Sequence, residues 1–193
     1  MRNVVLIILC VLPFIAGCTP AQQYLIGSQL KDVETNTLSI IDARPDSEKR
    51  AEILSLMVTS DNYGIFRIGD GQLTPDRISF LSNALNEQAV EQFSGKTITL
   101  KHFEIFNNQQ KALKKTAGYS AFGVAGAVAF AGVADDADAY IEVNLEFSVD
   151  DTTFAAKSVT GYRIDKWSGI SDDQVATHIQ TTMLDAVAKA ISK

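Results

Sequence analysis

The chain has 193 residues, of which 46% are hydrophobic and 21% are charged, and its formal net charge is −6. These values exclude a disordered, collagen-like or disulfide-dense chain and leave room for one domain with a sizeable core. The acidic balance also argues against nucleic acid as a partner, because that binding depends on clustered Lys and Arg side chains.

The N-terminal residues predict a signal peptide over residues 1–17. Arg2 supplies a positive start, and residues 4–16 form an uncharged, apolar run broken only by Pro13. A helix of this length reaches about 20 Å, which is shorter than the roughly 30 Å hydrocarbon layer of a bilayer. We therefore expect the segment to be removed and not to span a membrane.

The end of this run, Ile15-Ala16-Gly17-Cys18, resembles the lipobox of bacterial prolipoproteins. The resemblance implies cleavage between Gly17 and Cys18, a diacylglycerol on the Cys18 sulfur and a fatty acyl chain such as palmitate on the new amino group. Membrane lipid is then the expected partner, and several acyl chains anchor a protein durably. An ordinary secretory signal with an incidental cysteine is the alternative.

Thr19 follows the lipobox cysteine, where an aspartate in enterobacterial lipoproteins would favour retention in the inner membrane. By this analogy we expect the outer membrane, with the domain facing the periplasm. Cys10 lies in the removed segment, so the mature chain keeps one cysteine and no internal disulfide is expected. Residues 18–36 are mainly polar and predict a lipidated N-terminus and tether, although the apolar residues 24–26 are able to dock on the domain.

Residues 37–193 predict a single α+β domain. Residues 38–43, 53–59 and 63–68 have strand character. The sequence Thr74-Pro75-Asp76 then predicts a helix that starts with Thr74 as the N-cap and ends near Phe93. Its apolar residues recur at helical spacing: Ile78, Leu81, Leu85 and Ala89.

The second half of the domain repeats this order. Residues 96–106 predict a strand with a bulge near Lys101-His102. In residues 140–149 apolar residues alternate with polar ones, which predicts a strand with one buried face. With residues 153–164 this strand forms a predicted hairpin that turns at Asp150-Asp151. A closing helix begins at Ser171, where Gln174 completes a capping box. We expect a mostly antiparallel sheet of about six strands with two helices on one face.

Residues 117–134 form an uncharged segment rich in Gly and Ala. Its bulky side chains share the even positions (Phe122, Val124, Val128 and Phe130), while the odd positions from 121 to 131 hold only Ala or Gly. This pattern favours an extended ribbon or a loop over a membrane span. One interpretation is a surface loop or a small-residue helix packed on its own domain. The other is a contact surface for lipid, a protein partner or a second copy of the chain.

Sequence signals for catalysis are weak. His102 and His178 have no second ligand at metal spacing, no serine lies in a G-x-S-x-G motif, and neither a metal nor a cofactor is predicted. The pair Asp42 and Arg44 before Pro45 favours a local ion pair over a binding edge. The domain resembles YajG-like bacterial lipoproteins in the D-x-R sequence that ends its first predicted strand and in the helix after Thr74. This resemblance implies no functional residue.

We therefore expect an envelope lipoprotein, anchored through Cys18, with a non-catalytic role in binding or assembly. One alternative is an oligomeric component of a secretion or envelope complex that associates through residues 117–134. Another is a membrane-tethered hydrolase, which would require a serine, a histidine and an acidic residue to meet in one pocket.

Overall fold

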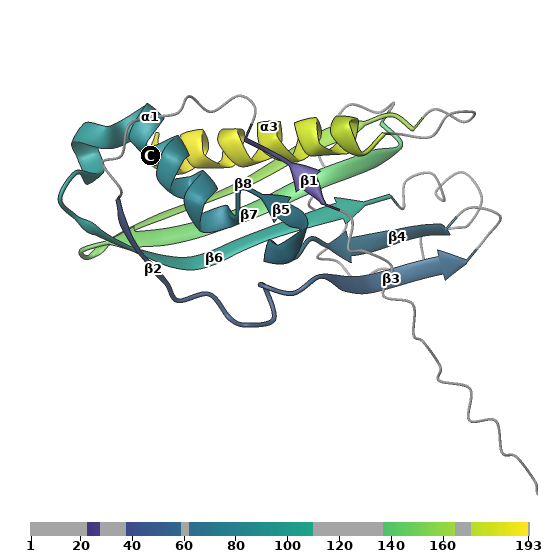
Figure 1. The fold of residues 1–193 in the computed structure, drawn as a ribbon, viewed down its shortest axis with the longest axis horizontal. Helices are drawn as coiled ribbons and strands as arrows, with labels where there is room; N and C mark the ends of the chain where they lie inside the picture. Colours follow the sequence, from purple (N-terminus) through teal and green to yellow (C-terminus); the bar gives the residue numbers. More distant parts are fainter. Residues whose placement is uncertain (1–22, 28–37, 59–61, 110–136, 165–170, 193) are drawn as a thin grey trace, which may run out of the picture.

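The computed structural model describes residues 23–27, 38–58, 62–109, 137–164 and 171–192. They form one α+β unit built on a six-stranded sheet with the order β3-β4-β6-β7-β8 and with β2 beside β6 (Figure 1). The strands are β2 (Ser39–Asp42), β3 (Glu52–Val58), β4 (Asn62–Arg67), β6 (Thr97–Asn108), β7 (Ala139–Val149) and β8 (Thr152–Tyr162). The β2–β6 pair is parallel and the other pairs are antiparallel. The predicted fold class is confirmed.

Two helices, α1 (Arg77–Phe93) and α3 (Asp172–Ile191), cover one face of this sheet. Figure 1 shows α3 lying along β7 and β8, with α1 at one end of the sheet. Strand β7 alternates as the sequence predicts, with Val143, Leu145 and Phe147 buried under α3 while Glu142 and Glu146 are half-buried on the other face. Burying one such alternating face stabilises the sheet through the hydrophobic effect.

The helix starts differ in how well the sequence predicts them. The capping box of α3 is confirmed, because Ser171 Oγ accepts the N–H of Gln174 at 3.3 Å and Gln174 Oε1 accepts the N–H of Ser171 at 3.1 Å. The predicted N-cap of α1, Thr74, is wrong: the cap is Asp76, whose carboxylate accepts the N–H groups of Ile78 and Ser79. Thr74 is held in a short strand and does not reach the helix.

That short strand, β5 (Leu73–Thr74), pairs in parallel with β1 (Tyr24–Leu25). The N–H of Ile26 also donates to the carbonyl of Thr74 at 2.8 Å. Tyr24 is 5% exposed and Ile26 is fully buried, so both belong to the core. The apolar cluster at residues 24–26 therefore docks on the domain.

Strand β6 contains the predicted bulge, seen as a register shift between Leu100 and His102. Without a bulge, Leu100 and Phe103 would point to opposite faces of the strand. The bulge turns both side chains toward the core, where both are buried. Along one edge, β6 pairs first with β2 and then with β4. Between these two partners, a stretch of β6 has no neighbouring strand on this edge among the described residues, and we call this place the gap.

The side chain of Glu48 closes this gap. Its Oε2 accepts the N–H of Phe103 at 3.2 Å, taking the place of a neighbouring strand. Arg77, fully buried, donates to the backbone carbonyls of Glu48 and Ile68 and so holds the crossing chain. Burial lowers the pKa of Arg77 to about 10, which still leaves it charged at neutral pH.

A second buried arginine confirms the predicted ion pair. Arg44 Nε lies 2.8 Å from Asp42, and its Nη2 lies 2.9 Å from Asp70. The hydrogen bond from Arg44 lowers the pKa of Asp42 to about 2. Asp70 also contacts Arg77, so two acids and two arginines form one network at the end of β2. The D-x-R sequence is a structural element of the fold.

Among the described residues, no helix combines the length and apolar character needed to cross a membrane.

Candidate functional site

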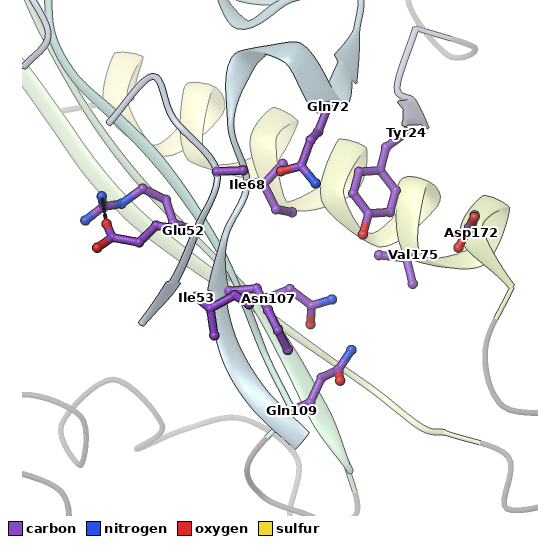
Figure 2. Close-up of a pocket in the computed structure, with 12 residues that line it drawn as sticks. Tyr24, Glu52, Ile53, Ile68, Gln72, Asn107, Gln109, Asp172 and Val175 are labelled. Carbon is purple, nitrogen blue, oxygen red and sulfur yellow. Dashed lines mark hydrogen bonds and ion pairs between the residues drawn. The ribbon is translucent and has the colours of Figure 1, made fainter. Parts of the chain in front are cut away.

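A cleft of about 420 Å³ lies at one end of the domain, between β3, β4, the end of β6 and the start of α3 (Figure 2). Its size is within the range of about 300–1,000 Å³ that is typical of small-molecule sites. The lining residues combine polar and apolar side chains: Tyr24, Ala51, Glu52, Ile53, Phe66, Arg67, Ile68, Gln72, Asn107, Gln109, Asp172 and Val175. We call this space the β3–α3 cleft.

Tyr24 reaches the cleft because strand β1 is docked on the domain. Figure 2 shows its ring beside α3 with the hydroxyl directed between Val175 and Asn107. Burial, together with the negative charge of Asp172, raises the pKa of Tyr24 to about 12. The phenol therefore stays protonated and offers an uncharged hydroxyl to the cleft.

Asn107 and Gln109, near the end of β6, meet at one buried hydroxyl. Tyr162 donates its O–H to Asn107 Oδ1 at 2.7 Å, and its oxygen also interacts with the side chain of Gln109. Asn107 is 5% exposed and Tyr162 is 3% exposed. The hydrogen bond from Tyr162 thus fixes the orientation of the Asn107 amide beside the cleft.

Gln72 lines the opposite side of the cleft. Its Oε1 accepts the N–H of Gly69 at 2.9 Å, which fixes the amide and turns its nitrogen toward Tyr24 in Figure 2. That bond belongs to the 3-10 turn η1 (Asp70–Gln72). A turn residue therefore positions a second amide donor.

The rim and floor of the cleft are an ion pair and apolar side chains. Glu52 Oε2 and Arg67 Nη1 lie 2.6 Å apart, and Arg67 also lies over the ring of Phe106. Phe66, Ile68 and Val175 supply apolar surface to the cleft. Ile53, on β3, is 61% exposed at the rim.

The two histidines lie on opposite faces of the sheet. His102, on the outer face, places Nδ1 2.5 Å from Oε1 of Glu48, and this hydrogen bond raises the pKa of His102. His178, on α3, stacks on Tyr162, and burial lowers its pKa. The structure does not bring the two histidines together.

His102 borders a shallow hollow of about 350 Å³ on the outer face. The residues that line it are His102, Glu104, Asn144, Leu145, Glu146, Ala155, Ala156 and Lys157, which include no serine, threonine or cysteine. No group of three His, Cys, Asp or Glu side chains within the described ranges is arranged to hold a metal ion. In the part of the chain that the structure describes, the Glu48–His102 pair therefore has no hydroxyl nucleophile in the hollow beside it.

Several predicted site residues fall outside the part of the chain that the structure describes: Gly17, Cys18, Phe122, Val124, Val128 and Phe130. The residues that form the cleft were not predicted, because isolated amides such as Gln72, Asn107 and Gln109 carry no motif. Residues 24–26 gave the only sequence signal, as an apolar cluster within a polar segment.

Comparisons of the chain with protein-family models, with curated proteins and with solved structures find no match.

Proposed function

We propose that this chain is a lipoprotein of the bacterial envelope, anchored through Cys18, whose α+β domain has a non-catalytic binding role at the β3–α3 cleft. The anchor rests on the lipobox-like sequence Ile15-Ala16-Gly17-Cys18. With Thr19 after the cysteine, the proposed location is the outer membrane, facing the periplasm. The domain would then stand beside a bilayer and bind a ligand in the periplasm.

The observation that carries the binding role is the set of oriented polar groups around the cleft. The amide oxygens of Asn107 and Gln72 each accept a hydrogen bond within the protein, at 2.7 Å and 2.9 Å, so both amides are held in fixed orientations beside the cleft. Polar groups that are already oriented lose little freedom when a ligand binds, so their convergence on one cleft favours a ligand. Convergent polar groups in an apolar cleft are typical of a binding site.

The tethered hydrolase has less support in the described residues. The Glu48–His102 pair resembles the acid and base of a catalytic triad, but its hollow offers no serine, threonine or cysteine to activate. Stabilising a gap in the sheet already accounts for the position of Glu48. A binding role therefore fits the site better than nucleophilic hydrolysis.

The anchor is tested by labelling cells with a palmitate analogue. Cys18→Ala is expected to lose the label and to leave the membrane fraction. Cys10→Ala, the matched control in the signal segment, is expected to keep both. Equal labelling of wild type and Cys18→Ala would refute the anchor.

Assembly through residues 117–134 remains the second candidate, because small residues allow close approach of two surfaces. Deleting the segment and comparing native gels of detergent extracts tests it. A smaller complex would support assembly through this segment, and an unchanged size would remove the idea.

A further inference from the structure

We infer that the β3–α3 cleft binds an uncharged saccharide, a ring with several neighbouring hydroxyl groups. This inference rests on the binding role proposed above and specifies the chemistry of the ligand. It follows from the charge of the cleft, from the hydrogen-bonding groups that line it and from the way these groups converge.

The charges in the cleft do not suit a charged ligand. The one cation in the lining, Arg67, is already paired with Glu52 at 2.6 Å, so an anionic group would have to displace a carboxylate. Asp172, the other acid, lies in the first turn of α3, where the helix dipole favours its negative charge. An uncharged ligand leaves the Arg67–Glu52 pair and the position of Asp172 at the helix start unchanged.

The remaining polar groups match hydroxyls. Gln72, Asn107 and Gln109 line the cleft with side-chain amides, which carry both donors and acceptors, and the Tyr24 hydroxyl also donates and accepts. A saccharide hydroxyl also does both, so neighbouring hydroxyls are able to satisfy donors and acceptors that stand close together. Carbon-bound hydrogens on the ring would pack against the apolar side chains of Phe66 and Val175.

The arrangement of these groups favours a compact ring over an extended peptide. Figure 2 shows Gln72 and Tyr24 on one side of the space and Asn107 and Gln109 on the other. They come from three separate segments of the chain and surround one volume of about 420 Å³. An extended peptide would instead place alternate side chains along a strand or groove.

The test uses the full lipidated chain in a detergent without a sugar headgroup. Ligand-observed NMR titrations compare two neutral disaccharides, maltose and N,N′-diacetylchitobiose, with glucuronic acid and with an end-blocked alanine peptide. We expect both neutral disaccharides to bind. Gln109→Leu, which keeps the size of the side chain but removes the amide, should bind them about tenfold more weakly.

The matched control is Gln88→Leu, the same substitution at an exposed position of α1, which should bind like wild type. Thermal unfolding of each variant confirms that it is folded. Tighter binding of glucuronic acid than of the neutral sugars would overturn the inference.

Binding of the peptide alone, weakened by Gln109→Leu, would overturn the saccharide and leave the binding role intact. Binding of no probe at all would overturn the inference and would also remove the support that the cleft gives to the binding role. Neither outcome bears on the anchor, which palmitate labelling decides separately.

Discussion

The carboxylate of Glu48 joins two structural tasks, because Oε1 lies 2.5 Å from Nδ1 of His102 while Oε2 accepts the N–H of Phe103 at 3.2 Å. Glu48 is 5% exposed and stands where β6 has neither β2 nor β4 beside it. A side chain thus completes the hydrogen bonding of a strand edge, and an exposed imidazole holds that side chain in place.

The pairing with Glu48 predicts a pH-dependent contribution from His102. Because the hydrogen bond raises the pKa of His102, the contribution is fully present below pH 6.5, the ordinary pKa, and is lost as pH rises through the raised value. His102→Gln should therefore lower the free energy of unfolding at acidic pH by up to ~1 kcal/mol and have little effect at alkaline pH. Denaturant unfolding across this range measures it.

His178 provides the control, because its effect on stability has the opposite dependence on pH. Burial lowers its pKa, so the folded state resists its protonation and loses stability as pH falls below 6.5. His178→Gln should remove that acidic loss. The same acid-side trend in both variants would contradict these assignments.

The buried Arg44 is expected to be among the most sensitive charged positions. Arg44→Ala leaves Asp42 and Asp70 without their shared partner and should destabilise the domain by about 3–5 kcal/mol. Arg50→Ala, at an exposed position, is the control and should stay within about 0.5 kcal/mol of wild type. Equal effects of the two substitutions would show that the network adds nothing.

The fall in the free energy of unfolding at acidic pH, the acid limb of the stability curve, depends on Asp42. Arg44 lowers the pKa of Asp42 from 3.8 to about 2, so this contribution is present above pH 3.8 and is lost as pH falls toward 2. Asp42→Asn should flatten this part of the curve, as measured by denaturant unfolding at several acidic pH values. An unchanged acid limb would contradict the lowered pKa.

Phe147 holds the aromatic centre of the core. Its ring stacks on Phe154 with 5.0 Å between centroids and meets the edge of Phe93 at 5.9 Å. Phe147→Ala should lower the free energy of unfolding by about 3–5 kcal/mol because it leaves a cavity, whereas Ile41→Ala, at a side chain 54% exposed, should cost far less. A loss below 1 kcal/mol for Phe147→Ala would contradict this packing.

The sequence was informative wherever structure depends on neighbours along the chain. The alternation of residues 140–149, the capping box at Ser171 and the bulge near His102 each follow from local periodicity or local hydrogen bonding, and each is confirmed. The prediction of the α1 N-cap was wrong because a contact with a distant part of the chain determines where the helix begins. Pairing with β1 holds Thr74 in β5, and Asp76 takes its place.

The cleft could not be predicted for the same reason. Tyr24 and Asn107 are far apart in the sequence, and only the docking of β1 and the Tyr162 hydrogen bond bring them to one space. Glu48 and Phe103 also meet across a long stretch of chain. Hydrophobic periodicity carries no information about such polar contacts.

The proposed anchor is tested most directly by mass spectrometry of the N-terminal peptide of the mature protein from its native membrane. The account predicts a peptide that begins at Cys18 and carries a diacylglycerol on its sulfur and an acyl chain on its amino group. An unmodified peptide that begins at any other residue would contradict it.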